Sequence, residues 1–342
     1  MMMWINTLSK LSHGVIEADT MGGKMFDKIW RKFVTALVFA TIIIILYNIV
    51  LGTIHTNIRY LLSYYAFTSL AILLIGWIIS AFRLKIIVES SFSVKSIGLF
   101  DCVKARFLGG LLANITPSSI GGEPARALYI SRLMDIDLTS SYAMAIYEVY
   151  YDVITINLIG FILSTWYLPR SIPVLLVSIS MTLSWIGIHV YLKNRSIVER
   201  TVILLGKILP KDIVARIYSY ISNFAQHYHN ISQRVGLGKK IIITFLTILY
   251  NSVWGMAIVP LQYVRHVEVN AESIMNAISS YYMMQSISAL PTPGGSGVAE
   301  YGLLIGLEPS VAMIYRIIYY YSTILIGLIV LTTTMRRDTK NR

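Results

Sequence analysis

Residues 291–300 read Pro-Thr-Pro-Gly-Gly-Ser-Gly-Val-Ala-Glu, and they interrupt a long apolar region of the chain. Proline lacks the N–H that a helix needs and glycine leaves the backbone free, so this stretch cannot continue a regular helix. In lipid, non-helical backbone persists only where protein or a water-filled cavity satisfies its polar groups. We therefore expect a broken membrane helix, with residues 271–290 before the break and a short helix from about Gly297 after it.

A second stretch of the same character lies in the first half of the chain. Residues 116–124 read Thr-Pro-Ser-Ser-Ile-Gly-Gly-Glu-Pro, and a short helix is expected at 123–134. The preceding segment, 93–115, alternates apolar and polar residues and fits an interfacial or re-entrant helix. Broken helices at corresponding places in two halves of a membrane protein point to a substrate site.

Composition indicates a multi-pass membrane protein. Of the 342 residues, 56% are hydrophobic and 13% are charged, whereas a soluble domain carries about 25% charged residues. The single cysteine, Cys102, excludes a disulfide framework, a Cys-based zinc site and an iron–sulfur cluster. The net charge of +12 would suit nucleic acid, but most basic residues flank apolar spans, which is typical of membrane orientation and headgroup contact. We therefore expect no nucleic-acid partner, no metal and no cofactor.

The apolar segments predict an all-α integral membrane protein with six full transmembrane helices and two inverted, broken or re-entrant helical elements. The six spans are placed at 33–51, 61–82, 139–163, 172–192, 241–261 and 310–334. Residues 193–240 differ, because charged residues alternate there with regularly spaced apolar ones. This pattern predicts amphipathic helices on the cytoplasmic membrane surface.

The distribution of basic residues predicts the orientation. Four segments, 1–32, 83–106, 193–240 and 335–342, hold 23 Lys and Arg residues. The loops between them hold three, Arg59, Arg170 and Arg265. Under the positive-inside rule, this bias predicts a multi-pass protein of the plasma membrane with both termini in the cytoplasm.

The order of elements predicts a single transmembrane domain, 1–342, built from two inverted halves with repeat cores at about 83–163 and 271–334. Residues 145–152 read Ala-Ile-Tyr-Glu-Val-Tyr-Tyr-Asp, and 313–320 read Met-Ile-Tyr-Arg-Ile-Ile-Tyr-Tyr. Superposition places Glu148 opposite Arg316. A charge at mid-span costs about 2.5–3.5 kcal/mol, so such residues face a partner or a cavity. We therefore predict a direct ion pair between Glu148 and Arg316, either as a tether between helices or as a switch.

These motifs resemble the lysylphosphatidylglycerol synthase flippase-like transmembrane family. The resemblance rests on residues 116–126, on Glu148 with Asp152, and on 290–300 followed by Arg316, and it covers most of the chain. The family includes the membrane part of bacterial lysylphosphatidylglycerol synthases and of some archaeal glycosyltransferases. The last span is followed here by a short tail, so the resemblance implies movement of a lipid headgroup across the bilayer rather than aminoacyl or sugar transfer.

We expect substrate contacts at the two breaks and at the charged spans. A helix that begins inside the membrane presents unpaired N–H groups and partial positive charge, which suit phosphate. The glycines would permit close approach of a ligand or only a tight turn against another helix. Glu123 and Glu300 fit helix caps, while Arg126 either pairs with Glu123 or binds phosphate. The candidate substrate-binding residues are Ser119, Gly121, Gly122, Glu123, Arg126, Glu148, Asp152, Pro293, Gly294, Gly295, Ser296, Gly297, Glu300 and Arg316.

The expected function is that of a flippase, which translocates an anionic phospholipid or a polyprenyl-phosphate-linked sugar by alternating exposure of a midplane site. One alternative is a membrane-embedded transferase acting on a lipid carrier, with Glu148 or Asp152 as general base. Another is an accessory subunit of a separate glycosyltransferase or synthase. No motif of serine hydrolases, P-loop ATPases or zinc proteases occurs, so we expect a lipid transporter rather than an enzyme. The sequence leaves open the lipid, the coupling ion, catalytic activity and homo-oligomerisation.

Overall fold

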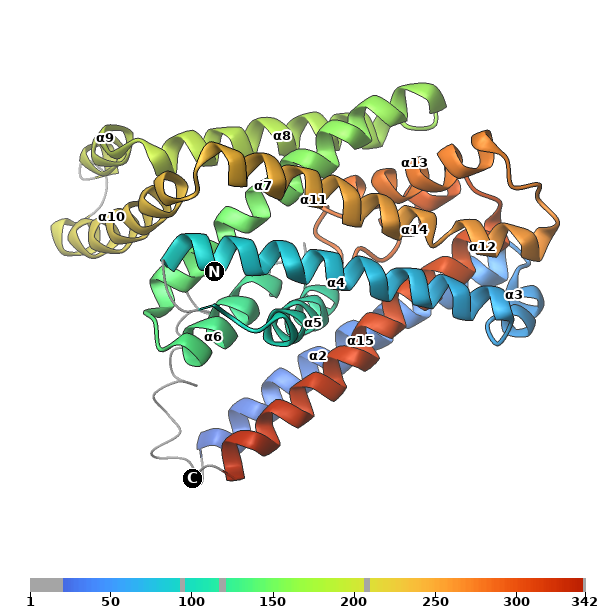
Figure 1. Ribbon diagram of the computed structural model, residues 1–342, viewed down its shortest axis with the longest axis horizontal. Coiled ribbons are helices and arrows are strands. Elements are labelled where there is room, and N and C mark those ends of the chain that lie inside the picture. The colour runs from blue at the N-terminus through green and yellow to red at the C-terminus, as the bar shows by residue number, and fades with distance from the viewer. Residues whose placement is uncertain (1–20, 93–95, 117–120, 206–209, 341–342) are drawn as a thin grey trace.

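The computed structural model describes residues 21–92, 96–116, 121–205 and 210–340. The described ranges are mostly helical and contain no strand (Figure 1). In chain order the elements are α2 (Met21–Val50), α3 (Ile54–Tyr60), α4 (Tyr64–Phe92), α5 (Leu99–Ile115), α6 (Gly122–Met134), α7 (Leu138–Ser164), η1 (Thr165–Tyr167), α8 (Ile172–Lys193), α9 (Arg195–Leu205), α10 (Lys211–Arg234), α11 (Leu237–Met256), α12 (Val259–Gln262), η2 (Tyr263–Arg265), α13 (Ala271–Ile287), α14 (Val298–Leu304) and α15 (Pro309–Lys340).

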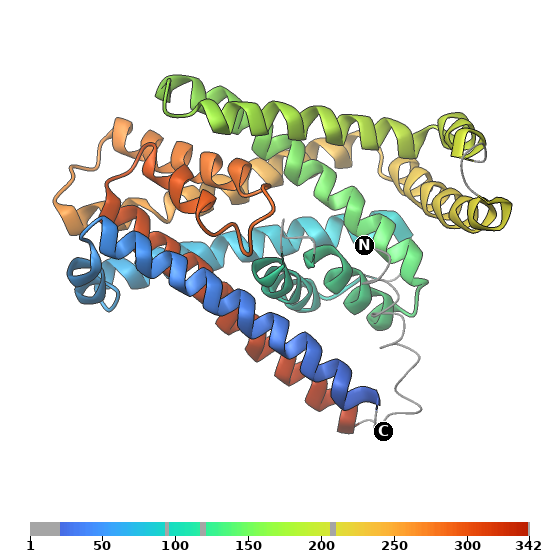
Figure 2. The same cartoon turned by 180° about the vertical axis from the view of Figure 1, so that it is seen from behind.

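Five of these helices are long and apolar enough to cross a membrane: α4, α7, α8, α11 and α15. The span expected at 33–51 falls in α2, whose apolar part, Val34–Val50, is shorter. Helices α4, α8 and α11 run roughly parallel along the long axis of the molecule, and α2 and α15 lie side by side at an angle to them (Figures 1 and 2). The protein is therefore an all-α membrane protein, as its composition predicts.

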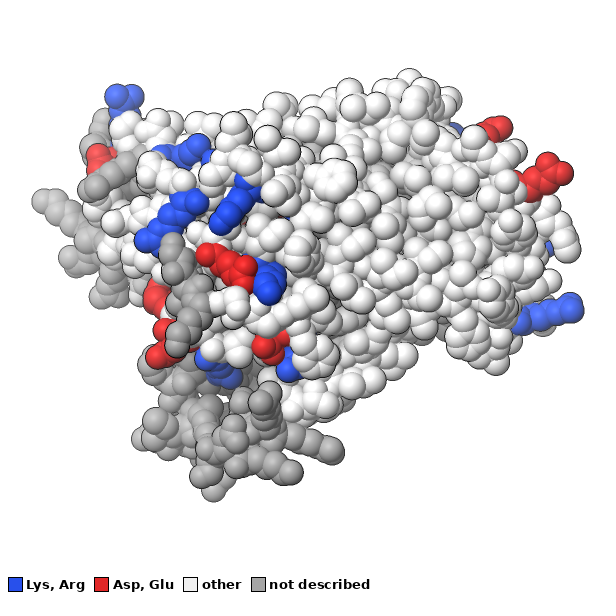
Figure 3. All heavy atoms as spheres, in the orientation of Figure 1, with Lys and Arg blue, Asp and Glu red and all other residues white. Residues whose placement is uncertain are grey.

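The outer surface of the bundle is apolar between two charged ends. Helix α8 exposes Leu176 and Leu183 at 62% and 64%, and α11 exposes Phe245 at 60%. Figure 3 shows a band without charged side chains across the middle of one face, with most charges at the end that carries α6, α9 and α10. Such a band would be an aggregation hazard in water, but it matches the hydrocarbon layer of a membrane.

Helix α4 continues ten residues beyond the end predicted for the second span and thereby carries Arg83 into the interior, where it is 0% exposed. Trp77 and Trp254 pack edge to face at the centre of the bundle, with ring centroids 5.0 Å apart. Gly76 makes this contact possible, because a Cβ there would lie against the Trp254 indole.

The two broken elements meet inside the bundle. Helix α5 ends at Ile115 and α6 begins at Gly122, while α13 ends at Ile287 and α14 begins at Val298. The loop between α13 and α14 reaches the end of α5, since a Cβ on Gly294 would lie 2.5 Å from the carbonyl oxygen of Asn114 (Figure 2). The Tyr320 hydroxyl donates a hydrogen bond of 3.3 Å to the same oxygen. The end of α5, the second break and the last span thus share one contact region.

Candidate functional site

Three arginines converge on two carboxylates inside the bundle, and we call this set the arginine cluster. Arg83 comes from α4, Arg106 from α5 and Arg126 from α6, while Glu148 and Asp152 lie one turn apart on α7. The three arginines and Glu148 are 0–7% exposed. Charged side chains are rarely buried this deeply unless they are paired, so the cluster is the strongest candidate site in the membrane region.

Glu148 lies at the centre of the arginine cluster. Its Oε1 accepts hydrogen bonds from Arg83 Nη2 at 2.7 Å and from Arg106 Nη1 at 2.8 Å. Its Oε2 lies 3.2 Å from Arg126 Nε. Arg83 also donates to both oxygens of Asp152, with Nη2–Oδ2 at 3.0 Å. Two adjacent arginines would repel each other, and the shared carboxylates offset that repulsion.

Neighbouring polar and aromatic groups orient the arginines. Thr247 of α11 accepts from Arg83 Nη1 at 2.7 Å, and Ser80 accepts from Arg106 Nε at 3.2 Å. The Tyr250 hydroxyl donates to Asp152, and its ring lies 5.0 Å from the guanidinium carbon of Arg83 and 5.7 Å from that of Arg106. These contacts fix two of the three guanidinium planes by hydrogen bonds and cation–π attraction.

Arg126 is held less completely than the other two arginines. Its Nε and Nη2 are buried and have no hydrogen-bond partner among the described residues. The 3.2 Å approach to Glu148 and the 3.7 Å approach to Glu123 are therefore electrostatic contacts without hydrogen-bond alignment. The Nε of Arg83 and the Oε2 of Glu148 are likewise unpartnered. Buried donors without acceptors are costly, so these N–H groups could bind an anion favourably.

The position of Arg126 depends on close packing between α5 and α6. A Cβ on Gly109 would lie 2.8 Å from the Arg126 side chain, so this glycine leaves room for it. A Cβ on Gly122 would lie 3.0 Å from the Gly109 carbonyl oxygen, and one on Gly121 would lie 2.9 Å from the Leu112 carbonyl oxygen. Of the two roles considered for this glycine pair, the structure shows the tight packing of one helix against another.

The second break holds its own ion pair. Arg316 of α15 is 2% exposed; it donates from Nε to Glu300 Oε1 at 2.7 Å and from Nη2 to the Gly294 carbonyl oxygen at 2.6 Å. Glu300 Oε2 also accepts from the Gly297 N–H at 2.6 Å, which caps α14 as expected. Gly294, Gly295 and Gly297 have φ of 58°, 71° and 89°, a region that favours glycine.

The predicted ion pair between Glu148 and Arg316 is wrong. Each residue finds its partners within its own half of the chain: Glu148 among the three arginines, and Arg316 at Glu300 and Gly294. The second break folds α14 back against α15, which brings Glu300 to Arg316. Glu148 instead meets Arg83 of α4 and Arg106 of α5, which the charge count places in a cytoplasmic segment at 83–106. Removing Arg83 and Arg106 from that count leaves 21 basic residues against three.

The remaining predicted site residues are distributed around these two centres. Glu123 stands beside Arg126, and Asp152 belongs to the arginine cluster. Pro293 and Gly295 lie in the second break with Ser296, which is 3% exposed and whose hydroxyl has no partner among the described residues. Ser119 lies outside the described residues.

Sequence reasoning missed four members or supports of the arginine cluster: Arg83, Arg106, Thr247 and Tyr250. The available signals were the central position of Arg106 in an apolar segment and the position of Arg83 directly after a predicted span.

A chain of buried polar groups runs from the arginine cluster toward the second break. Thr247 bonds to Arg83, and the carbonyl oxygen of Thr247 accepts from Asn251 Nδ2 at 2.8 Å. Asn251 Oδ1 accepts from Tyr281 at 3.1 Å, and Gln285 Nε2 lies 2.9 Å from the hydroxyls of both Tyr281 and Tyr319. Tyr319 is three residues from Arg316, so α11, α13 and α15 are joined by side-chain hydrogen bonds between the two centres.

Comparison with known proteins adds the family. A family model described as the lysylphosphatidylglycerol synthase TM region matches residues 28–327, from α2 into α15, and includes both breaks and every residue of the arginine cluster. Searches of curated proteins and of solved structures gave no match. Because the match covers most of the chain, this protein belongs to the lysylphosphatidylglycerol synthase transmembrane-region family.

Proposed function

We propose that this protein translocates a lipid with an anionic headgroup across the membrane, and that Arg126 and its neighbours in the arginine cluster bind the headgroup phosphate. The observation that carries the proposal is a set of buried N–H groups on Arg126 and Arg83 that have no hydrogen-bond partner among the described residues. Arginine suits phosphate because its planar guanidinium donates several hydrogen bonds in a fixed geometry. Anionic phospholipids and polyprenyl-phosphate-linked sugars both carry this group.

The burial of the arginine cluster supports a mechanism of alternating exposure. Glu148 is 0% exposed and occupies the place where an incoming phosphate would compete for the same guanidinium groups. In this proposal the α5–α6 element opens the arginine cluster to one face, and the α13–α14 element opens a path to the other. The two elements form the cores of inverted repeats at about 83–163 and 271–334, as alternating access commonly requires.

A membrane-embedded transferase is the alternative that the geometry favours less. A general base needs an oxygen directed at the substrate proton. Both oxygens of Glu148 face guanidinium groups, and both oxygens of Asp152 accept hydrogen bonds from Arg83. A role as accessory subunit of a separate glycosyltransferase or synthase does not account for the buried Arg126 and Arg83 donors that have no partner among the described residues.

The test is lipid translocation by the full chain reconstituted in vesicles without any donor substrate. Labelled phosphatidylglycerol should move between leaflets, and Arg126→Gln should slow it about 10-fold to 100-fold, the value of a charge-assisted hydrogen bond. Arg132→Gln is the matched control, because Arg132 lies on the same helix but is exposed. Equal rates for the Arg126 variant and the control, with both proteins folded, would contradict the proposed site. Activity only when a donor substrate is added would favour the transferase.

We further propose that both termini and the α9–α10 region face the cytoplasm of a cell with this protein in its plasma membrane. Cysteine labelling in a Cys102→Ala background can test the orientation. Asn194→Cys, on an exposed residue between α8 and α9, should react only from inside. Glu268→Cys, exposed at the opposite end, should react with an impermeant reagent added outside. The reverse pattern would invert the proposed topology.

A further inference from the structure

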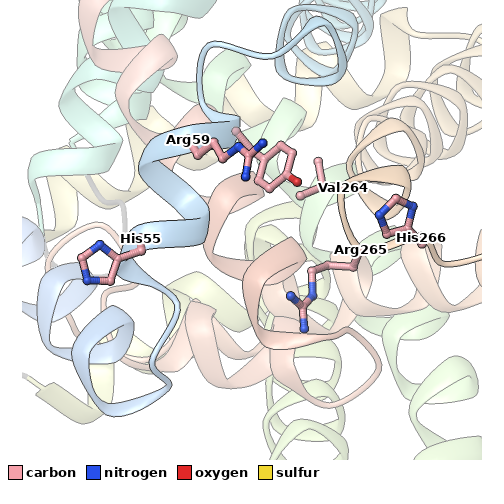
Figure 4. A pocket seen from close by; sticks show the side chains of 6 residues that line it. His55, Arg59, Val264, Arg265 and His266 are labelled. Carbon is pink, nitrogen blue, oxygen red and sulfur yellow. The ribbon is translucent and has the colours of Figure 1, made fainter.

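A cationic hollow lies at the end of the molecule that carries few charges. It has a volume of about 340 Å³ and is lined by residues of α3 and of the η2 turn. Arg59 and His55 come from α3, while Arg265 and His266 come from η2 and the residue after it (Figure 4). A second hollow of about 350 Å³ adjoins it and shares Tyr60, Val264 and His266. This region is separate from the arginine cluster, whose residues come from α4, α5, α6 and α7 and line neither hollow.

The charges of the hollow are concentrated rather than scattered. Only three basic residues occupy the short loops at this end in the predicted topology, and two of them, Arg59 and Arg265, line this one hollow. Arg265 is about half exposed and pairs with Glu308 at 3.3 Å. Arg59 has no ion-pair partner among the described carboxylates, and its guanidinium lies 5.7 Å from the ring of Tyr60. Glu268 lines the adjoining hollow, so the basic groups face one free acid and one paired acid.

Aromatic and apolar residues place the hollow at the membrane–water boundary. Tyr65 and Tyr263, which line the adjoining hollow, stack with ring centroids 5.7 Å apart. Leu62 and Phe67, two residues after Tyr60 and Tyr65, are 82% and 60% exposed. Tyrosines are enriched at the level of lipid headgroups, and exposed apolar side chains beside them mark the start of the hydrocarbon layer. An anion bound by Arg59 and Arg265 would therefore sit at headgroup depth.

We propose that this hollow binds the phosphate of a lipid headgroup in the leaflet opposite to the α9–α10 end. Arg59 supplies a guanidinium that has no acidic partner among the described carboxylates. Arg265 supplies a second guanidinium, which can exchange Glu308 for phosphate. Tyr60 provides a neighbouring surface for the glycerol or sugar part of the headgroup. The binding does not depend on transport. If the protein translocates lipid as proposed above, the hollow is the headgroup site at the far end of the path.

The test is binding of phosphatidylglycerol to the purified full chain in detergent, with bound lipids counted by native mass spectrometry. The double variant Arg59→Gln with Arg265→Gln should lose one tightly bound lipid, with affinity reduced about 25-fold if each arginine near the membrane surface contributes about five-fold. Arg170→Gln is the matched control, because it removes the third basic residue of the same end from outside the hollow. Glu308→Gln should instead tighten binding, because it frees Arg265 from its acidic partner.

Two further arms separate the alternatives. The first arm repeats the measurement in an Arg126→Gln background, which removes the proposed transport site. If Arg126→Gln alone keeps the bound lipid and loses it when Arg59→Gln and Arg265→Gln are added, the lipid is bound at the hollow, whatever the translocation assay shows. Titration with inorganic phosphate distinguishes a soluble anion from a lipid. Loss of phosphate binding with unchanged phosphatidylglycerol binding would overturn the lipid assignment. Equal lipid binding by the wild type and the double variant, or an equal loss in Arg170→Gln, would overturn the site.

Discussion

Replacement of Glu148 by Gln is the most informative perturbation of the arginine cluster. The change keeps the shape of the side chain and removes the charge that three guanidinium groups share. Arg83 would keep Asp152 as a partner and Arg126 would keep Glu123. Arg106 would have no carboxylate partner left among the described residues, and it is only 6% exposed.

The expected cost follows from this inventory of partners. Removing one member of a buried ion pair costs about 3–5 kcal/mol, because the remaining charge stays buried without compensation. Glu148→Gln should fall in that range because of Arg106. Arg106→Gln should cost less, since Glu148 keeps two other arginines. The double variant leaves neither charge stranded, so its cost should be smaller than the sum by about 1.5–3 kcal/mol, the value of a hydrogen bond between charged groups.

The assay is a double-mutant cycle on the free energy of unfolding, measured by SDS titration in mixed micelles with far-ultraviolet circular dichroism. A second cycle, between Glu148 and Arg316, serves as the control. These two residues share no ion-pair partner, so their effects should add within about 0.3–0.5 kcal/mol. Additive costs for Glu148 and Arg106, or clear coupling between Glu148 and Arg316, would refute the assignment of partners made here.

Two further predictions concern helix α4 and the second break. Arg83→Gln should lower thermal stability in detergent markedly, because Arg83 donates hydrogen bonds to Glu148, Asp152 and Thr247. Lys85→Gln, two residues later, should leave thermal stability unchanged, because Lys85 is partly exposed and its pair with Glu89 is 3.8 Å long. Gly294→Ala should destabilise the protein by about 1–3 kcal/mol, because φ at this residue is 58° and the added Cβ meets the Asn114 carbonyl oxygen. Gly187→Ala is the control and should be neutral, because no atom lies within 4 Å of its added Cβ. Equal melting temperatures for the two alanine variants would count against backbone strain at the second break.

Features encoded locally could be predicted from the sequence. The two breaks follow from Pro and Gly at 116–124 and 291–300, because these residues end a helix whatever surrounds them. The cap formed by Glu300 follows from its place three residues after Gly297. The membrane class follows from the length of the apolar runs, since a crossing helix needs about 20 such residues.

Features that depend on distant partners could not be predicted. The expected second span ends at residue 82, directly before Arg83, yet α4 continues to Phe92. Arg83 is tolerated in the helix because α7 and α11 supply acceptors for it. A hydropathy profile of one segment contains no information about acceptors on other helices. For the same reason, the ion pair predicted for Glu148 uses Arg316, the opposite charge that the proposed repeat aligns with it.

The glycine pair of the first break shows why replacing a glycine with a larger residue is not a sufficient test of a ligand site. A Gly122→Val variant would block a substrate that approaches the backbone at this glycine. The structure places its Cβ 3.0 Å from the Gly109 carbonyl oxygen and 3.2 Å from the Ala113 side chain. Valine there would separate α6 from α5 and displace Arg126, so loss of transport would not distinguish misfolding from lost binding. A change at the Arg126 side chain leaves this helix contact intact.

The two breaks carry charge in different ways, and this difference has a functional consequence. Arg316 donates from Nε to Glu300 and from Nη2 to the Gly294 carbonyl, so it holds the backbone of the second break. Arg126 has donors without a hydrogen-bond partner among the described residues, which is why we propose that it binds an anion. Arg316→Gln should therefore slow translocation of zwitterionic and anionic lipids alike, because the proposed mechanism needs an ordered second break for every lipid. Arg126→Gln should slow anionic lipids selectively. Rates for phosphatidylcholine and phosphatidylglycerol measured side by side would decide this, and a headgroup preference altered equally by both variants would show that the two halves share one binding site.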